Sequence, residues 1–480
     1  MRFAARHGNI AQLLHRTGCH MSDYSFSQLK LRAELLDNLL SLGFKSMTAI
    51  QAQSLPMILA GQDVIAQGQT GSGKTAAFGL GLLNKLDIKL FKVQSLVLCP
   101  TRELAEQVSG ELRRLARAIP NVKIVTVYGG TPIKAQANSL EKGAHIVVGT
   151  PGRIDDHLSK ANLDLSQMNT LVLDEADRML DMGFQKTLEA IIDLVPSERQ
   201  TLLFSATFPA QIKSVANSIM QNPSMTQVAP TQDTVRVEQA FFFVENETDR
   251  LQSLKLILLD NAEKQSVVFC NTRQDTQTVA GALKSSGFSA APLHGDMEQK
   301  DRDQTLIRFS NSSINILVAT DVAARGLDID TLELVFNYHL PRELEVYTHR
   351  IGRTGRAGEK GQACSLFQLS EQFRIDQLEA YLEQEIRPSD LPPIELLEQA
   401  PARPIMSTLR VEGGKRQKLR PGDLVGALTK SDQITGQNLG KIQVMENWAY
   451  VAVDRPLAKS ALQQISQGKI KGKSFRARLI

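Results

Sequence analysis

The sequence predicts an α/β protein with two parallel-sheet domains in tandem, followed by a small α+β domain. Short β-branched apolar runs alternate with longer amphipathic stretches from about residue 24 to 225, and the alternation returns between 240 and 367. Strands that alternate with helices form βαβ units and a parallel sheet covered on both faces. Five of the 18 prolines then fall within 388–404, which indicates a linker before the last domain.

The apolar runs predict the strands of each domain in order. In the first domain they are 63–66, 95–99, 123–128, 145–149, 170–173 and 201–205, with helices between them such as 102–118. The polar stretch 221–238 has two prolines and no clear period, so we predict a linker there. The second series predicts strands at 240–244, 266–270, 315–319, 332–336 and 362–367, and helices near 249–260, 273–286 and 297–310.

The C-terminal residues alternate in the order β-α-β-β-α-β, which predicts an RRM-like α+β domain. Its strands are expected near 408–412, 441–445, 449–453 and 473–479, and its helices near 422–430 and 457–467. The predicted divisions are an N-terminal extension at 1–22, α/β domains at 23–225 and 235–385, a linker at 386–404, and the RRM-like domain at 405–480. The first 20 residues have three arginines and no acid, as in a transit peptide; we favour an upstream start, with Met21 as the initiator.

Composition excludes several classes of protein. A chain of 480 residues with 42% hydrophobic and 22% charged residues is neither disordered nor a disulfide-stapled mini-protein. No apolar run approaches the ~18 residues of a membrane span, so we predict no membrane partner. The four cysteines are widely spaced, which favours reduced thiols and a cytoplasmic protein over a zinc site.

The net charge of +4 is unevenly divided. Residues 404–480 contain 14 Lys and Arg against 5 Asp and Glu, a surplus of +9, whereas the rest of the chain is at −5. A basic C-terminal domain on a slightly acidic body predicts a polyanion-binding module. The alternative is a solvated basic tail.

A phosphate-binding loop follows the first strand. Its residues fit G-x-x-x-x-G-K-[ST]: Gly68, Gln69, Thr70, Gly71, Ser72, Gly73, Lys74 and Thr75. Between a strand and a helix, such a loop wraps the β-phosphate with backbone N–H groups. Lys74 then places a charge on the β and γ oxygens, and the Thr75 hydroxyl binds Mg²⁺. The alternative is a glycine-rich turn with an unrelated lysine.

Three acidic residues follow the predicted strand at 170–173. Asp174 can reach the Mg²⁺ held by Thr75, through water, since it lies at the carboxyl end of a parallel strand. Glu175 is then placed to orient the attacking water or accept its proton. Alone, acids at 174–177 would indicate only a solvated helix start.

Arginines of the second domain are candidates to complete this site. Arg353 and Arg356 lie three residues apart, so on a helix they would share one face and could reach a γ-phosphate as arginine fingers. The alternative is a basic surface helix that faces solvent or nucleic acid. If both domains supply residues, hydrolysis requires them to close.

The chain resembles the DEAD-box ATP-dependent RNA helicases over about 24–385. The motifs that carry the resemblance are Phe26 with Gly43-Phe44 and Gln51, the 68–75 loop, Pro100–Ala105, Gly129-Gly130, Thr150–Arg153, Asp174–Asp177, Ser205–Thr207, Val268–Thr272, Gln299–Arg302, Ala319–Asp321, Arg325–Asp328 and His349–Arg356. The resemblance implies two RecA-like domains that use ATP and Mg²⁺ and bind RNA. One position departs from the family, because Ala49 stands where the family usually has proline.

The resemblance also implies a role for individual residues. Gln51 reads the adenine edge, Phe26 stacks on the base, and Asp328 contacts the ribose. Coupling of hydrolysis to strand separation falls to Ser205, Thr207, Asp177 and His349. The RNA path is lined by Arg102, Gly129, Thr150, Arg153, Asn271 and Thr320, mostly at phosphates and 2′-hydroxyls.

The C-terminal domain, together with the body, is similar to that of the bacterial DbpA group of this family. Its first strand has no aromatic residue for base stacking, which favours an electrostatic surface built from Arg410, Lys415, Arg416, Lys418 and Arg420 with Lys469, Lys471, Lys473, Arg476 and Arg478. The resemblance implies a monomer that binds a 23S rRNA hairpin and unwinds short duplexes during large-subunit assembly. The alternatives are an ATP-gated RNA clamp or general remodeller, and a DNA translocase.

Overall fold

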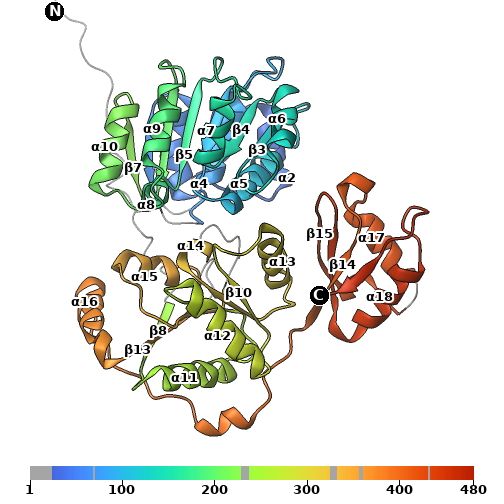
Figure 1. The fold of residues 1–480 in the computed structure, drawn as a ribbon. Coiled ribbons are helices and arrows are strands. Elements are labelled where there is room, and N and C mark those ends of the chain that lie inside the picture. The colour runs from blue at the N-terminus through green and yellow to red at the C-terminus, as the bar shows by residue number, and fades with distance from the viewer. Residues whose placement is uncertain (1–23, 69–70, 229–236, 325–331, 356–360, 431–432) are drawn as a thin grey trace, which may run out of the picture. The chain divides into compact units, whose positions relative to one another are not determined.

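The computed structural model describes residues 24–68, 71–228, 237–324, 332–355, 361–430 and 433–480. They form two compact units, Met1–Gln232 and Asp233–Ile480 (Figure 1). The first unit contains one parallel sheet, and the second contains a parallel sheet and a small antiparallel one. The predicted fold class is confirmed, whereas the five predicted divisions of the chain stay predictions. The predicted extension at 1–22 lies outside the described residues.

The sheet of the first unit has seven parallel strands in the order β3-β4-β2-β5-β6-β1-β7. The strands are β1 (Val64–Gln67), β2 (Ser95–Leu98), β3 (Ile124–Val127), β4 (Ile146–Gly149), β5 (Thr170–Asp174), β6 (Gln200–Ser205) and β7 (Ser224–Gln227). In β1 to β6 nearly every residue is buried, because each face of the sheet has its own hydrophobic core. Val64 and Ala66 enter one core and Ile65 the other, as strand alternation requires.

Helices cover both faces of this sheet. One face packs against α2 (Ala33–Ser41), α3 (Ala49–Leu59), α4 (Lys74–Lys85) and α5 (Arg102–Leu115). The other packs against α6 (Ile133–Glu141), α7 (Pro151–Ser159), α8 (Ala176–Asp181), α9 (Gln185–Asp193) and α10 (Ala210–Ile219). In α5, buried Leu104, Val108, Leu112 and Leu115 recur at helical spacing, which gives that helix its apolar stripe.

The second unit begins with a parallel sheet in the order β10-β11-β9-β12-β13-β8. Its strands are β8 (Val237–Phe243), β9 (Ser266–Phe269), β10 (Ala290–Leu293), β11 (Ile316–Ala319), β12 (Leu334–Asn337) and β13 (Gly361–Phe367). One face packs against α11 (Glu247–Asp260) and α12 (Arg273–Ser285). The other packs against α13 (Gln299–Ser310), α14 (Asp321–Ala324), α15 (Leu344–Ile351) and α16 (Gln372–Leu382).

Two edge strands differ from the sequence prediction. β7 lies within the predicted linker 221–238, and β8 begins at Val237, inside the same prediction. Residues 229–236 of that linker lie outside the described residues. β7 escapes a hydrophobicity pattern because it is a polar edge strand in which only Thr226 is buried. β10 was not predicted either, since it contains Pro292, which an edge strand tolerates.

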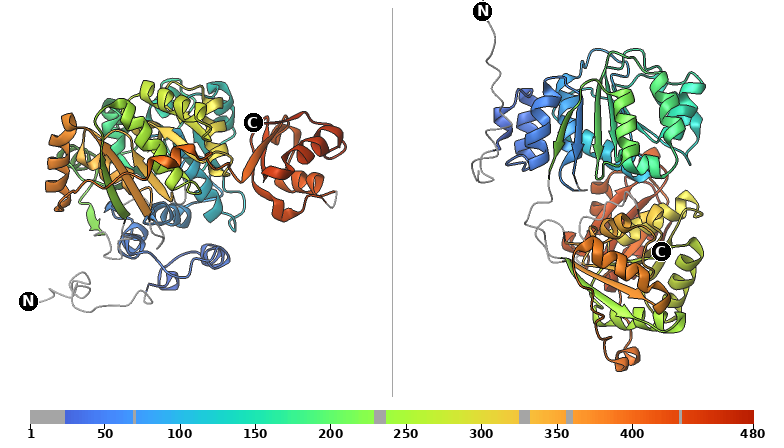
Figure 2. Two further views of the ribbon diagram at one scale, coloured as in Figure 1. Left: turned by 90° about the horizontal axis from the view of Figure 1, so that it is seen from below. Right: turned by 90° about the vertical axis from the view of Figure 1, so that its left-hand side faces the viewer.

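The last sheet is antiparallel and has the order β15-β16-β14-β17. It belongs to the red C-terminal part of the ribbon in Figure 2. Its elements are β14 (Met406–Val411), α17 (Pro421–Leu428), β15 (Leu439–Val444), β16 (Ala449–Asp454), α18 (Ala458–Gln467) and β17 (Ala477–Leu479), so the predicted β-α-β-β-α-β order is confirmed. Leu409 and Val451 of one sheet face pack with Leu424 and Ile465 of the two helices. No helix within the described part of the chain is long and apolar enough to cross a membrane.

Candidate nucleotide site and nucleic-acid interface

The strand order of the first unit brings the predicted motifs to one edge of the sheet. The phosphate loop follows β1, Asp174 ends β5, and Ser205 ends β6, and these three strands are neighbours. Arg102, Gly129 and Thr150 follow β2, β3 and β4, which are also neighbours. Parallel strands share a carboxyl edge, where α/β proteins bind ligands. One half of this edge therefore carries the ATP motifs and the other half the predicted RNA contacts.

The phosphate loop is anchored at both of its ends. The Gly68 N–H donates to the Ser205 carbonyl at 3.0 Å, and the buried Lys74 Nζ donates to the Gly68 carbonyl at 2.6 Å. Gly73 has a φ of +92° just before α4 begins at Lys74, a conformation that favours glycine. The first turn of α4 has backbone N–H groups without a partner inside the helix, and they lie beside a lysine, which suits an anion. Gln69 and Thr70 lie outside the described residues.

Helix α3 braces the same loop. Gln51 Nε2 donates to the Gly73 carbonyl at 3.1 Å, and Thr48 Oγ1 donates to the Ser72 carbonyl at 2.7 Å. A Cβ at Gly73 would lie 2.5 Å from Gln51 Nε2, so a larger residue there would displace the Gln51 side chain. Gln51 Oε1 accepts the Thr48 N–H at 2.9 Å, and α3 begins at Ala49 without the usual proline. Adenine recognition by Gln51 stays a prediction.

Phe26 lies in the core rather than on an open surface. Its ring is 5% exposed and meets Phe44 edge to face, with 6.3 Å between the ring centroids. Little of the ring is available to a base, and stacking on adenine stays a prediction.

The acid cluster is buried. Asp174 is 3% exposed; burial, and next the charge of Glu175, raise its pKa to about 7 against the opposing charge of Lys74. Glu175 follows in a left-handed conformation with a φ of +52°, and α8 begins after it. Its Oε2 lies 2.9 Å from Nη1 of Arg178. Sequence reasoning missed Arg178, although the i, i+3 spacing on a helix could have indicated the pair.

Three predicted coupling residues contact one another. Asp177 Oδ2 accepts the Thr207 N–H at 2.9 Å and the Thr207 hydroxyl at 2.8 Å, and the Asp177 N–H donates to the Ser205 hydroxyl. Burial alone would raise the pKa of Asp177, but the hydrogen bonds from Thr207 and Ser205 outweigh it and hold the pKa below its ordinary value. Because the Ser205 carbonyl also receives Gly68, the network joins α8, β6 and the phosphate loop.

The predicted RNA contacts of the first unit also lie close together. A Cβ on Gly129 would lie 3.2 Å from an Arg102 guanidinium nitrogen, so the two residues pack against each other. Thr150 precedes α7, and the Thr150 carbonyl accepts the Arg153 N–H at 3.1 Å. Arg153 Nη1 donates to Gln136 Oε1 at 3.0 Å, and the buried Gln136 was not predicted.

In the second unit, Asn271 follows β9 and Thr320 follows β11, which are adjacent strands. Asn271 Nδ2 donates to the Leu340 carbonyl, and its Oδ1 accepts Arg350 at 3.0 Å. Arg350 is 2% exposed and also binds both carboxylate oxygens of Asp321. Sequence reasoning missed this role of Arg350, because its partners are far apart in the sequence.

The predicted arginine pair does not share a helix. α15 ends at Ile351 and is capped by Gly352, so Arg353 lies beyond the helix, and the expectation of one helical face is wrong for it. Glycine at this position favours a helix end. His349 lies in the last turn of α15 and is half-buried. Arg356 and Asp328 lie outside the described residues.

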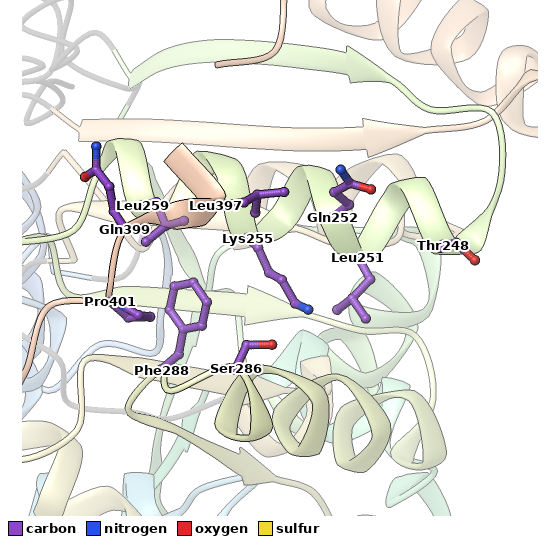
Figure 3. Close-up of a pocket in the computed structure, with 10 residues that line it drawn as sticks. All are labelled: Thr248, Leu251, Gln252, Lys255, Leu259, Ser286, Phe288, Leu397, Gln399 and Pro401. Atoms are coloured by element: carbon purple, nitrogen blue, oxygen red, sulfur yellow. The ribbon is translucent and has the colours of Figure 1, made fainter. Parts of the chain in front are cut away.

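A cavity of about 420 Å³ lies away from these motifs, between α11, the segment before β10 and the predicted linker (Figure 3). Lys255 and Phe288 line it, together with Leu397 and Pro401 from the linker. The short 3-10 helix Ile394–Glu398 packs on α11 there. None of the predicted site residues lines it, so we place the candidate site at the sheet edges instead.

Three family descriptions match successive parts of the chain. They are "DEAD/DEAH box helicase" over residues 48–215, "Helicase conserved C-terminal domain" over 249–358, and "DbpA RNA binding domain" over 408–479. The first two contain the sheet edges described above. The third contains the antiparallel sheet.

Whole-chain relatives agree with these matches. The chain is 49% identical to the ATP-dependent RNA helicase DbpA of Escherichia coli, over 93% of this chain and 97% of that protein. It is 37% identical to DbpA of Bacillus subtilis, over 95% and 98%. The structure of S. cerevisiae Dbp5 bound to RNA and ADP BeF3 matches with a TM-score of 0.68 and 31% identity, over 76% of this chain and 96% of that one. This chain therefore belongs to the DEAD-box family of ATP-dependent RNA helicases, as an RNA-stimulated ATPase of the DbpA type with its own RNA-binding domain.

Proposed function

We propose that this helicase unwinds short duplexes in 23S rRNA during assembly of the large ribosomal subunit, and that its C-terminal domain anchors it to an rRNA hairpin. The observation that carries the proposal is a basic surface on that domain. Its members are exposed: Lys415, Arg416, Lys418, Arg420, Lys469 and Lys473. RNA affinity is supplied largely by such contacts to phosphates.

Two segments that lie far apart in the sequence form the basic surface. Lys471 Nζ donates to the Lys418 carbonyl at 3.0 Å and lies 2.7 Å from an Asp423 carboxylate oxygen. Lys471 therefore ties the loop after α18 to the loop after β14. Charges from both loops therefore add to one positive field. This supports a folded, RNA-binding surface rather than a solvated basic tail, and it favours a compact RNA ligand.

The sheet itself offers no stacking platform. Tyr450 of β16 is 2% exposed. Arg410, which the sequence placed in the basic cluster, is 3% exposed, with its guanidinium carbon 4.1 Å from the Trp448 ring centroid. Lys300 Nζ lies 5.5 Å from the same ring, and Asn311 donates to Thr408 Oγ1 at 2.9 Å. The face opposite α17 and α18 is thus covered, which supports an anchor built on the loops.

The ATP half of the first sheet edge suits hydrolysis. We assign Lys74 to the β and γ oxygens, Glu175 to the attacking water, and Arg353 with Arg356 to the charge that develops in the transition state. Thr75 and Asp174 would hold Mg²⁺, which would supply positive charge to offset that of the phosphates. A buried carboxylate with a raised pKa suits a cation neighbour.

The network of Asp177, Ser205 and Thr207 supports the proposed coupling. It lies between the phosphate loop and the strand ends that carry the predicted RNA contacts. A shift of the loop on hydrolysis would change the Gly68–Ser205 hydrogen bond. Because Ser205 also bonds to Asp177, the shift would alter the position of Asp177. We propose that this chain of contacts, with His349 of the second unit, joins ATP turnover to release of the RNA.

The second candidate is an ATP-gated clamp or general remodeller without rRNA specificity. Glu175 favours turnover over a permanent clamp, since a clamp has no need of a group that activates water. Steady-state ATPase rates separate the candidates when measured without RNA, with unstructured RNA, and with a 23S fragment that carries the hairpin. Strong stimulation by the fragment, lost on deletion of residues 404–480, would support the anchor. Equal stimulation by every RNA would leave a general remodeller.

A further inference from the structure

Arg178 forms a buried ion pair with Glu175. It is the third residue of the short helix α8 and is 4% exposed. Its Nη1 is 2.9 Å from Glu175 Oε2, and the two side chains are only 5% and 8% exposed. A pair with so little solvent around it is weakly screened and holds one geometry.

The surroundings of Glu175 make such a partner necessary. Asp174, Glu175 and Asp177 are three buried acids within four residues. The charge of Arg178 also helps to lower the pKa of Asp177, although less than the hydrogen bonds of Thr207 do. The left-handed backbone at Glu175 is uncommon for a residue with a side chain and is retained where the surroundings enforce it.

We propose that Arg178 is a positioning residue that fixes the Glu175 carboxylate for the attacking water, an inference that rests on the proposed role of Glu175. Arg178 occupies Oε2, which leaves Oε1 to accept a proton. The water oxygen bonds to the γ-phosphorus as the bond to the ADP oxygen breaks, and one water proton passes to Oε1. Arg178 acts through Glu175 and touches no reacting atom in this scheme.

The test is a double-mutant cycle on the full chain. Arg178→Met removes the charge and keeps much of the side-chain volume, and Arg178→Lys restores the charge without the planar fork. We expect Arg178→Met to lower kcat by about ten- to a hundredfold, with the KM for ATP and the RNA midpoint within about twofold. Arg178→Lys should recover part of this loss. In the Glu175→Gln background, Arg178→Met should change kcat by no more than about twofold, because the group it positions is gone.

A matched control is Arg199→Met, because half-buried Arg199 donates to the Pro196 carbonyl just before β6, at the opposite end of that strand from Ser205. It should lower Tm slightly and leave kcat unchanged. An unchanged or faster Arg178→Met enzyme would overturn the inference, as would equal loss of kcat in both backgrounds. If Arg178→Met does not fold, the folded Arg178→Lys enzyme provides the test. A wild-type kcat in that enzyme would overturn the inference, and a reduced kcat at unchanged Tm would support it. Wild-type turnover by Glu175→Gln would instead refute the proposed role of Glu175, and this inference with it.

Discussion

The ATP half of the first sheet edge and the basic surface hold their charges in opposite ways. Lys74, Asp174 and Glu175 are 7%, 3% and 6% exposed, and Lys74 and Glu175 are held in place by a hydrogen bond and an ion pair. Lys415, Arg416 and Lys418 are exposed and act on a ligand through a shared field. A buried group is defined by its geometry, whereas an exposed charge is interchangeable with its neighbours. A single substitution should therefore have a large effect in the first region. In the second region each substitution should have a small effect, and the effects should add.

Glu175→Gln should have the largest effect. Loss of a group that activates water lowers kcat by roughly 10² to 10⁴, while ATP and RNA still bind and hold a long-lived closed complex. Steady-state ATPase and RNA dissociation rates measure the two effects. Exposed Glu189→Gln of α9 is the matched control and should behave as wild type. Wild-type turnover in the Glu175 variant would show that a single buried group is not decisive in the ATP half, and the contrast between the two regions would fail.

Removal of three charges should act next most strongly. Lys415, Arg416 and Lys418, all changed to Gln, should weaken binding of the hairpin fragment and lower the slope of log affinity against log salt by about 2. Binding titrations at several salt concentrations measure the slope. Basal ATPase should be unchanged. The same change at exposed Lys142, Lys160 and Lys186 of the first unit is the control, and an equal loss there would remove the basic surface as the anchor.

Thr207→Val tests the buried network without removing a charge. The variant loses the 2.8 Å hydroxyl bond to Asp177 but keeps the backbone one. A lost hydrogen bond of about 1 kcal/mol predicts a several-fold fall in duplexes unwound per ATP hydrolysed. Parallel unwinding and ATPase assays on one duplex give this ratio. An unchanged ratio with lower Tm would assign Thr207 to stability alone.

A single charge on the basic surface should matter least. Lys473→Gln is expected to change hairpin affinity by no more than about threefold, because exposed charges share the field. Fragment titration at fixed salt measures it. A loss as large as that of the triple variant would mean that Lys473 makes a specific contact, and the contrast between the two regions would then fail.

Motifs at strand ends were predicted well from the sequence, and side-chain pairing was not. The order of loop, acids and Ser205–Thr207 follows from strand alternation, and the shared carboxyl edge then follows from parallel strands. The Arg350 network joins Asn271, Asp321 and Asn337, and no local period connects them. β7 and β10 were missed for a related reason, since polar or proline-containing edge strands lack a hydrophobic signature.

Burial also removes one predicted charge from the basic surface. Arg410 belongs by sequence to a basic cluster, but β14 alternates, so the side chain points to a covered sheet face while Lys415 stays exposed. Composition gave the surplus of +9 without showing which charges face solvent. The packing of Arg410 on Trp448 distinguishes this buried charge from the exposed Lys415.

Trp448 is the only tryptophan among the 480 residues. Its indole is half-buried between Arg410 and Lys300, so its emission wavelength and quenching depend on that one environment. Selective excitation of tryptophan therefore addresses a native fluorophore just before β16, with no label required. Titrations with RNA and with nucleotide can be followed optically at this position, and a spectral shift reports on the covered sheet face while the ATPase assay reports on the first unit.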